Sequence, residues 1–333
     1  MINRIILITL AILLIGFFWF YYQINLFKDS FCDEGSVFTI SRGENFIEIG
    51  NNLKEEGIID NPLYFNTYVL VSGKFNRLQA GTYLLCPDDS IKNISEILAR
   101  GETAQDRITI VEGWNMRDIG NYFEKIGIID EENFIERIKS NNFNDLFSFL
   151  EEKPEGATLE GYLFPDTYFI PYDSDIDSII KLMLYNFNDK LTDDLREEIR
   201  NQEKTIFEII TVASLIEKEV RSYEDKRLVS GIIWKRLEIG MPLQIDATIS
   251  YITGRRTTRI SITETQIDSP YNTYKYKGLP VGPISNPGIE SIKAAIFPEK
   301  SDYLFYLSKP DSGETVFSKN HDEHVAAKNK YLR

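Results

Sequence analysis

The chain has 333 residues, of which 43% are hydrophobic and 26% are charged, and its 37 basic and 51 acidic residues give a formal net charge of −14. This length is enough for about two globular domains, and the composition excludes a collagen-like, disordered or small disulfide-stabilised chain. A net charge of this sign repels phosphate polymers, so nucleic-acid binding is disfavoured.

The first predicted element is a membrane helix. Residues 5–22 contain no charged side chain and end in an aromatic run from Phe17 to Tyr22. Eighteen helical residues span about 27 Å, close to the thickness of a bilayer core. Because the run is long and no small-residue cleavage site follows it, it predicts a single-pass anchor rather than a signal peptide. With residues 1–4 in the cytoplasm, the chain beyond a linker at 23–36 would lie on the extracytoplasmic, periplasmic side of the cell (inner) membrane.

Two cysteines, Cys32 and Cys86, lie in the part of the chain that follows this helix. An oxidising compartment would permit a disulfide bond between them, although the sequence also allows both to stay reduced. Neither lies beside a histidine, and the only histidines are His321 and His324. A zinc-type site is therefore not expected, and we predict neither a metal nor another cofactor.

A repeated segment organises the first half of the chain. Residues 38–60 align without gaps to residues 108–130, and eleven of the 23 positions are identical. Each copy predicts a short strand, a turn at Gly43 or Gly113, and an amphipathic helix that ends at a second glycine. Two copies are too few for a solenoid, so we interpret them as one supersecondary unit used twice.

The first copy would open a small strand–helix–helix–strand module at residues 37–103, and the second would lead into a larger domain at residues 104–333. A module of this kind outside a membrane resembles a LysM-like domain. That resemblance implies binding to glycan chains. A spacer that holds the larger domain away from the membrane is an equal alternative.

The remainder of the sequence predicts a larger α+β domain rather than a repeating strand–helix–strand fold. Helices are expected at residues 175–200, 204–221 and about 224–239, and a loop rich in Pro, Gly, Tyr and Asn follows at 268–288. A short helix, a strand at residues 303–306, a turn and a last helix complete the domain.

One acidic residue lies on the apolar side of the helix predicted at 204–221. Placing residues at 100° intervals puts Glu217 about 40° from the middle of the stripe that would face the core. The other two acids, Glu208 and Glu219, fall on the opposite side. A carboxyl in an apolar wall holds its proton near neutral pH, as a general acid must. The alternative is a glutamate at the helix end that pairs with Arg221 or reaches into solvent.

Five ordered motifs resemble the endolytic murein transglycosylases of the MltG/YceG-like family. They are LEGYLFPDTY at 159–168, ASLIEKE at 213–219, MPLQIDAT at 241–248, SPYNTY at 269–274 and GLPVGPISNPG at 278–288. Their order and spacing agree with the family over about residues 38–330. The catalytic glutamate of the family is the first acid of the A-S-x-x-E-K-E motif, which corresponds to Glu217.

The resemblance implies a membrane-bound lyase that cuts peptidoglycan glycan strands internally during cell-wall assembly. Glu217 would give a proton to the glycosidic oxygen between MurNAc and GlcNAc, then take the proton of the muramic acid 6-hydroxyl. The products would carry 1,6-anhydro-MurNAc ends, and glycan strand growth would end there. Ordinary glycosidases instead use two carboxylates. The family also implies that such an enzyme works beside peptidoglycan synthases.

Ten further polar residues of these motifs are candidates for substrate binding. They are Glu160, Tyr162, Asp166, Gln244, Asp246, Thr248, Tyr271, Asn272, Tyr274 and Asn286. Tyrosine rings and amide groups suit N-acetyl sugars. Structural alternatives stay open, because Asp246 can cap a helix through Thr248, and a Tyr-rich loop can serve packing alone. Glu160 and Asp166 can orient Glu217, bind a ring hydroxyl or cap a turn.

Two other functions are consistent with these residues. The first is a hydrolysing glycosidase in which Asp166 or Asp246 activates water and leaves reducing ends. The second is a non-catalytic, membrane-anchored scaffold that binds peptidoglycan through the repeated unit.

Overall fold

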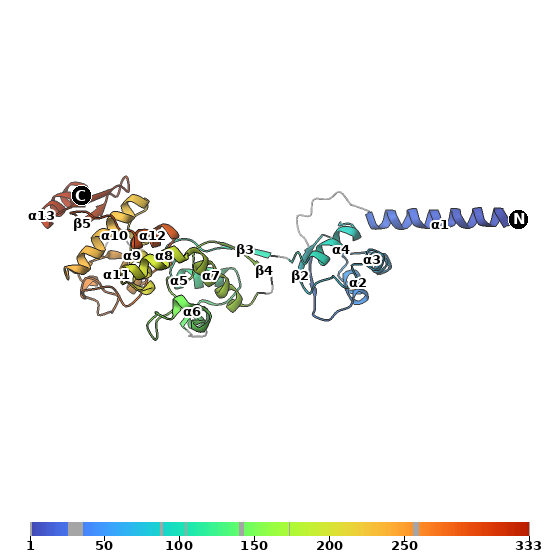
Figure 1. Ribbon diagram of the computed structural model, residues 1–333, viewed down its shortest axis with the longest axis horizontal. Helices are drawn as coiled ribbons and strands as arrows, with labels where there is room; N and C mark the ends of the chain where they lie inside the picture. The colour runs from blue at the N-terminus through green and yellow to red at the C-terminus, as the bar shows by residue number, and fades with distance from the viewer. Residues whose placement is uncertain are drawn as a thin grey trace. The chain divides into compact units, whose positions relative to one another are not determined.

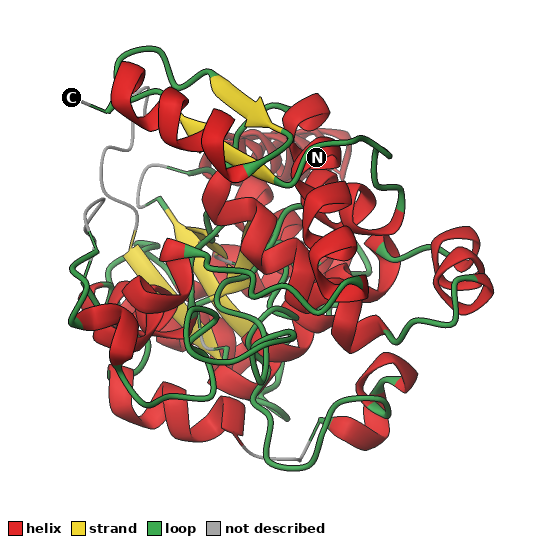
Figure 2. Cartoon of the chain, turned by 90° about the vertical axis from the view of Figure 1, so that its left-hand side faces the viewer, coloured by secondary structure: helices red, strands yellow, loops and turns green. Residues whose placement is uncertain are grey.

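A computed structural model describes residues 2–25, 36–86, 89–103, 105–139, 143–172, 174–255 and 260–332. The fold mixes helices with short, two-stranded sheets and begins with one apolar helix (Figure 1, Figure 2). Two compact units divide the chain. The first comprises Met1–Arg107 and Phe169–Ser174, and the second comprises Ile108–Tyr168 and Asp175–Arg333. The domain boundaries expected from the sequence stay predictions.

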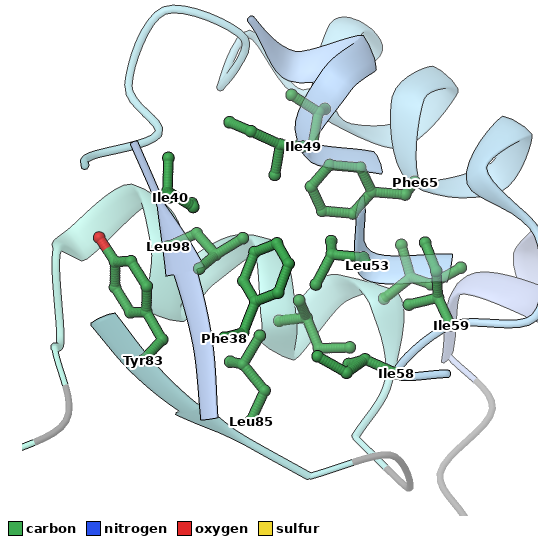
Figure 3. Packing of buried hydrophobic residues seen from close by; sticks show 13 residues of the cluster. Phe38, Ile40, Ile49, Leu53, Ile58, Ile59, Phe65, Tyr83, Leu85 and Leu98 are labelled. Atoms are coloured by element: carbon green, nitrogen blue, oxygen red, sulfur yellow. The ribbon is translucent and has the colours of Figure 1, made fainter. Parts of the chain in front are cut away.

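The first unit combines the apolar helix with a small helix-and-sheet core. Its elements are α1 (Ile2–Asn25), β1 (Ser36–Ile40), α2 (Phe46–Glu55), α3 (Pro62–Val71), β2 (Gly81–Leu85) and α4 (Ile91–Arg100). Strands β1 and β2 pair antiparallel, with Phe38 opposite Tyr83. Figure 3 shows how Phe38, Leu53, Phe65 and Leu98 fill the space between this sheet and the helices. Helix α4 adds a third helix to the strand–helix–helix–strand pattern expected from the sequence.

Helix α1 has the length and composition expected of a membrane segment. Its apolar span at Arg4–Asn25 is long and apolar enough to cross a bilayer, and its side chains are exposed apart from a few near the end of the helix, such as Ile24. Beyond this helix, Cys86 directly follows β2 and is disulfide-bonded. The other cysteine, Cys32, lies outside the described residues.

The remaining elements build the part of the chain that carries the five motifs. They are β3 (Gln105–Thr109), α5 (Met116–Lys125), α6 (Glu131–Lys139), β4 (Thr167–Pro171), α7 (Ile176–Lys190), α8 (Asp193–Asn201), α9 (Ile206–Glu219), α10 (Tyr223–Glu238), α11 (Asp246–Thr253), α12 (Ile289–Ile296), β5 (Phe305–Ser308), β6 (Thr315–Ser318) and α13 (His321–Tyr331), with 3₁₀ turns at Asn144–Leu146, Ser148–Leu150 and Glu264–Gln266. Strand β3 pairs with β4, and β5 pairs antiparallel with β6. Helices α9, α10 and α12 pack against one another (Figure 1).

Two predicted elements need correction. The single helix expected at residues 175–200 is two helices, because Thr192 adopts an extended conformation with φ −58° and ψ 162°. The side chain of Arg196 donates to the carbonyl of Leu191 (2.7 Å) and so satisfies the end of α7. The strand expected at 303–306 lies two residues later, at β5.

The repeat seen in the sequence is a repeat in structure. Helices α2 and α5 both begin with a capping box, at Asn45 and Asn115 respectively. Each is followed by a glycine with positive φ, 72° at Gly57 and 77° at Gly127, which ends the helix. The predicted turns and helix ends are therefore confirmed in both copies.

One buried amide joins three segments of the second unit. The Oδ1 atom of Asn286 accepts from the backbone N–H groups of Gly161 (2.9 Å) and Leu163 (3.0 Å). Its Nδ2 group donates to the carbonyl of Trp114 (3.0 Å) and to Oε1 of Glu160 (3.0 Å). An amide has two acceptor and two donor positions, and here all four are used. The motif loops at 159–168 and 278–288 are thus fixed to the turn before α5.

Glu160 is the second buried member of this network. Glu160 is only 1% exposed to solvent. Oε2 accepts from the N–H of Met116 (2.9 Å) and from the hydroxyl of Tyr251 (3.3 Å). Burial raises the pKa of Glu160 to about 8, although these hydrogen bonds act in the opposite direction.

Position 161 requires a glycine, both because of its backbone conformation and because its neighbours leave no space for a side chain. Its φ is +90°, and a Cβ there would lie 2.7 Å from Ile210 Cγ2 and 2.7 Å from Pro283 Cβ. Gly161→Ala should therefore cost about 2 kcal/mol or more in unfolding free energy. Gly156 has a similar φ of +79° but open space around it, so Gly156→Ala should cost about 1 kcal/mol. Chemical denaturation of both variants measures the difference, and equal losses would contradict tight packing at Gly161.

The raised pKa of Glu160 predicts a pH-dependent stability. The contribution of its protonated form is complete below the ordinary carboxyl range and is lost as the pH rises through about 8. The unfolding free energy should fall by about 1–3 kcal/mol between pH 5 and pH 8.5, and Glu160→Gln should remove part of this fall. Denaturation curves across this pH range test it, with the exposed Glu155→Gln as a control that keeps the wild-type slope. An unchanged slope in Glu160→Gln would contradict the prediction.

Candidate active site

Glu217 lies near the end of α9 with its carboxylate fully occupied by donors. Lys226 Nζ lies 3.3 Å from Oε1 and 3.5 Å from Oε2. Oε2 also accepts from Ser291 Oγ (2.6 Å) and from the N–H of Gly288 (3.0 Å). The side chains of Glu217 and Lys226 are only 8% and 4% exposed.

These contacts correct the expectation of an apolar wall around Glu217. The helical periodicity correctly predicts that the side chain of Glu217 points inward, but α10 and α12 present polar groups to it. Its ionic partner is Lys226 and not Arg221, which was the alternative suggested by the sequence. A carboxylate that accepts hydrogen bonds at both oxygens is suited to hold negative charge in a largely buried position.

The N-terminus of α12 is part of this site. Gly288 is the N-cap residue of α12 and has no side chain with which to cap it. The carboxylate of Glu217 takes this role from a neighbouring helix, where the helix dipole favours negative charge. Ser214, in the same motif as Glu217, holds the loop before α12 against α9. Its Oγ accepts from Ile284 N (3.0 Å), and its carbonyl accepts from Ser285 Oγ (3.1 Å).

The turn between β3 and α5 covers the other side of Glu217. A Cβ placed on Gly113 would lie 3.5 Å from Glu217 Cγ. Lys218 Nζ donates to the carbonyl of Gly113 (3.1 Å). Next to it, the carboxyl of Glu112 lies against Gly288, because a Cβ placed there would be 1.9 Å from Glu112 Oε1. This turn belongs to the second copy of the repeat.

Four groups of the site were missed by the sequence reasoning, namely Glu112, Lys226, Gly288 and Ser291. Lys226 and Ser291 come from separate helices, and no local pattern pairs them with Glu217. A signal did exist for Glu112, because the aligned position of the first repeat copy holds Arg42. A change from base to acid between two otherwise similar turns indicates a different task for the second turn.

Glu219 is also desolvated, although the periodicity had placed it on the solvent side. Burial raises its pKa to about 7, while a hydrogen bond with Tyr306 and the charge of Arg236 lower it. The negative charge of Asp246 raises it further. Glu219 therefore belongs to a second polar cluster near the start of α11, two residues along the chain from Glu217.

Burial corrects the prediction for five of the ten candidate sugar-binding residues. Glu160, Tyr162, Thr248, Asn272 and Asn286 are at most 1% exposed, so they offer no surface to a ligand. Tyr162 packs in an aromatic core against Phe149 and Phe187. The others shape loops. Thr248 donates to the Ile245 carbonyl (2.7 Å), and Asn272 donates to the Ile267 carbonyl (2.7 Å).

The other five candidates are accessible, and for these sugar binding stays a prediction. Asp166, Gln244 and Asp246 are exposed, and Tyr271 and Tyr274 are partly buried. The hydroxyl of Tyr274 donates to Asp246 Oδ1. The N-cap residue of α11 is Ile245 and no side chain caps this helix, so Asp246 does not cap it through Thr248. Gln244 has a φ of 52°, an unfavourable value for a residue other than glycine. Strain of this kind persists only where neighbours impose it, and it often marks functional positions.

The chain is similar to known proteins over most of its length. A sequence model described as the YceG-like family matches residues 38–330. An endolytic murein transglycosylase of Bacillus subtilis is 35% identical over 304 residues, which cover 88% of this chain and 84% of the relative. An endolytic murein transglycosylase of Streptococcus pneumoniae is 32% identical over 312 residues, and the match covers 86% of this chain but 56% of that longer protein.

A solved structure shares the fold. The crystal structure of a yceG-like protein from Listeria monocytogenes aligns with a TM-score of 0.60 at 30% identity, covering 89% of this chain and 99% of that one. The family match, the relatives and the shared fold all extend over most of the chain. The chain therefore belongs to the YceG-like family.

Proposed function

We propose that this protein is a membrane-anchored lytic transglycosylase that cuts peptidoglycan glycan strands internally, with Glu217 as its catalytic acid and base. The observation that carries the proposal is the arrangement of the Glu217 carboxylate, held by Lys226, Ser291 and the N-terminus of α12 within the A-S-x-x-E-K-E motif. The names of the B. subtilis and S. pneumoniae relatives support the substrate and the reaction class.

The chemistry needs one carboxyl that changes its role. Protonated Glu217 donates its proton to the glycosidic oxygen between MurNAc and GlcNAc as that bond breaks. The resulting carboxylate takes the proton of the muramic acid 6-hydroxyl, whose oxygen attacks C1 and closes the 1,6-anhydro ring. The nucleophile belongs to the substrate, so the high effective concentration of a tethered group replaces an activated water.

The neighbours of Glu217 stabilise the negative charge that it acquires during the reaction. When Glu217 gives up its proton, Lys226, Ser291 Oγ–H and Gly288 N–H are already in place to stabilise the carboxylate. Fixed donors need no reorganisation during the reaction, and this lowers the barrier. The carboxylate left after proton donation then accepts the proton of the 6-hydroxyl.

Sugar rings would be held by the accessible motif residues. Asp246 and Tyr274 are joined by a hydrogen bond near Glu219, two residues beyond the catalytic acid. The side chain of Gln244 projects from a strained backbone at the start of the same segment. These groups, with Tyr271 and Asp166, are our candidates for contact with N-acetyl sugars.

Helix α1 would place this activity at the membrane. Its length and apolar composition fit a single-pass anchor, and the short N-terminal side with Arg4 fits the cytoplasm. The second unit would then work on the extracytoplasmic side, beside the synthases that produce new glycan strands. The first unit, which resembles a LysM-like domain, would add affinity for glycan.

Glu217→Gln should abolish strand cleavage. A glutamine cannot donate or accept the proton, so activity should fall by about a thousandfold. The unfolding free energy should fall as well, because the buried Lys226 loses its anion. Mass spectrometry of glycan strands after incubation with the protein measures the 1,6-anhydro-MurNAc ends. Glu224→Gln, which changes an exposed acid at the start of α10, should keep wild-type activity.

Other outcomes of this experiment identify the rival functions. Reducing ends in place of anhydro ends would indicate a hydrolase. Strands that bind both proteins but are not cut by the wild type would indicate a scaffold. A Glu217→Gln variant as active as the wild type would remove Glu217 from the mechanism.

Glycan binding by the first unit can be measured separately. The hydrophobic core of the first unit lies within residues 38–98, so a fragment of residues 26–103, which keeps both cysteines, should fold without the second unit. It should sediment with insoluble peptidoglycan stripped of its peptides and should stay in solution with cellulose. A folded fragment that binds neither polymer would favour the spacer interpretation.

A further inference from the structure

A second acid lies beside the proposed catalytic acid, and both carboxyls contact the same residue. Gly288 donates its N–H to Glu217 Oε2 (3.0 Å). The carboxyl of Glu112 packs against the Cα atom of Gly288. If residue 288 had a Cβ atom, that atom would lie 1.9 Å from Oε1 and 2.3 Å from Cδ of Glu112. Gly288 has an ordinary φ of −73°, so backbone conformation does not require glycine here. The glycine instead makes room for the carboxyl of Glu112.

The backbone around Glu112 is fixed to the loop that carries Gly288. The N–H of Gly113 donates to the carbonyl of Asn286 (2.9 Å), and the N–H of Asn286 donates to the carbonyl of Trp114 (2.7 Å). Lys218 holds the same turn from α9 through the Gly113 carbonyl (3.1 Å). The short distance between Glu112 and the site is therefore set by the main chain and not by a mobile side chain alone.

The charges around Glu112 come from three helices, α9, α10 and α12. Partial desolvation is the main cause that raises its pKa, the negative charges of Glu217 on α9 and Glu290 on α12 raise it further, and Lys226 on α10 lowers it. Lys218, also on α9, donates to the carbonyl of Gly113 next to Glu112. If both were ionised, Glu112 and Glu217 would place two negative charges next to the buried cation Lys226. One proton on the pair would balance that cation.

We propose that Glu112 is a positioning residue for the proton of Glu217, and that the two carboxyls share one proton next to Lys226. The like charge of Glu112 opposes the loss of the proton from Glu217, whereas Lys226 and the N-terminus of α12 favour it. The proton that Glu217 gives to the glycosidic oxygen returns from the 6-hydroxyl. Glu112 therefore neither gains nor loses a proton over the cycle. This inference rests on the proposed role of Glu217.

The pH dependence of strand cleavage tests this role. In Glu112→Gln, Glu217 loses a neighbouring negative charge and should give up its proton more easily. The alkaline limb of the pH–rate profile should move to lower pH by about one unit, while the rate at the acidic plateau should stay within about threefold of wild type. Glu290→Gln removes a charge from an exposed position on α12 and should move the limb far less.

Gly288→Ala provides a second variant that keeps all charges. Its methyl group would push the carboxyl of Glu112 away, which is cheap because that carboxyl ends a flexible side chain. The alkaline limb of the pH–rate profile should again move to lower pH. The thermal unfolding temperature should stay within a few degrees of that of the wild type. An alkaline limb that stays in place in Glu112→Gln, or a loss of rate that is equal at every pH, would overturn the proposal. Failure of the proposed function is read separately, from residual activity in Glu217→Gln.

Discussion

The arrangement of the site depends on the hydrogen bonds of one buried amide, Asn286. Its side chain joins the loop at 159–168 to the turn before α5, and its backbone exchanges two hydrogen bonds with that turn. Two residues later, Gly288 begins α12 and holds the carboxylate of Glu217. The same short segment therefore sets both the distance between the two motif loops and the position of the catalytic acid. Because a fully satisfied buried amide has one favourable arrangement, the network specifies a single geometry.

The balance of charge follows from this geometry. Lys226 is almost completely buried, and a buried cation is tolerated only when an anion and hydrogen-bond acceptors compensate it. Glu217 provides that compensation, but an ionised carboxylate has no proton to donate. Glu112, placed by the same turn, works against ionisation of the pair. Some groups of the site therefore stabilise the carboxylate that forms when Glu217 gives up its proton, whereas Glu112 opposes the loss of that proton.

Local features of this protein could be predicted from its sequence, and contacts between distant segments could not. The helix around Glu217, the repeat and its glycine-terminated helices follow from periodicity and turn chemistry, and all are present. Lys226 could not be paired with Glu217, because that contact requires the packing of α10 on α9. The same limit explains Tyr162 and Asn272, whose residue types suit sugars but whose side chains fill and brace the interior. Motif residues of both kinds look alike in a single sequence.

The two copies of the repeat show how a site can arise on an unchanged framework. Both copies keep the asparagine cap of the helix and the same turn hydrogen bond, from Glu44 N to Ser41 O (3.3 Å) in one and from Trp114 N to Val111 O (3.1 Å) in the other. The differences lie in the side chains of the turn and in the loop between the second helix and the second strand. That loop is short in the first copy, whereas in the second it contains the motif at 159–168. A rigid unit tolerates such changes because turns contribute little to its core. The acid at position 112 is thus a property of the second copy's turn, and it can be altered without disturbing the helix and strand that position it.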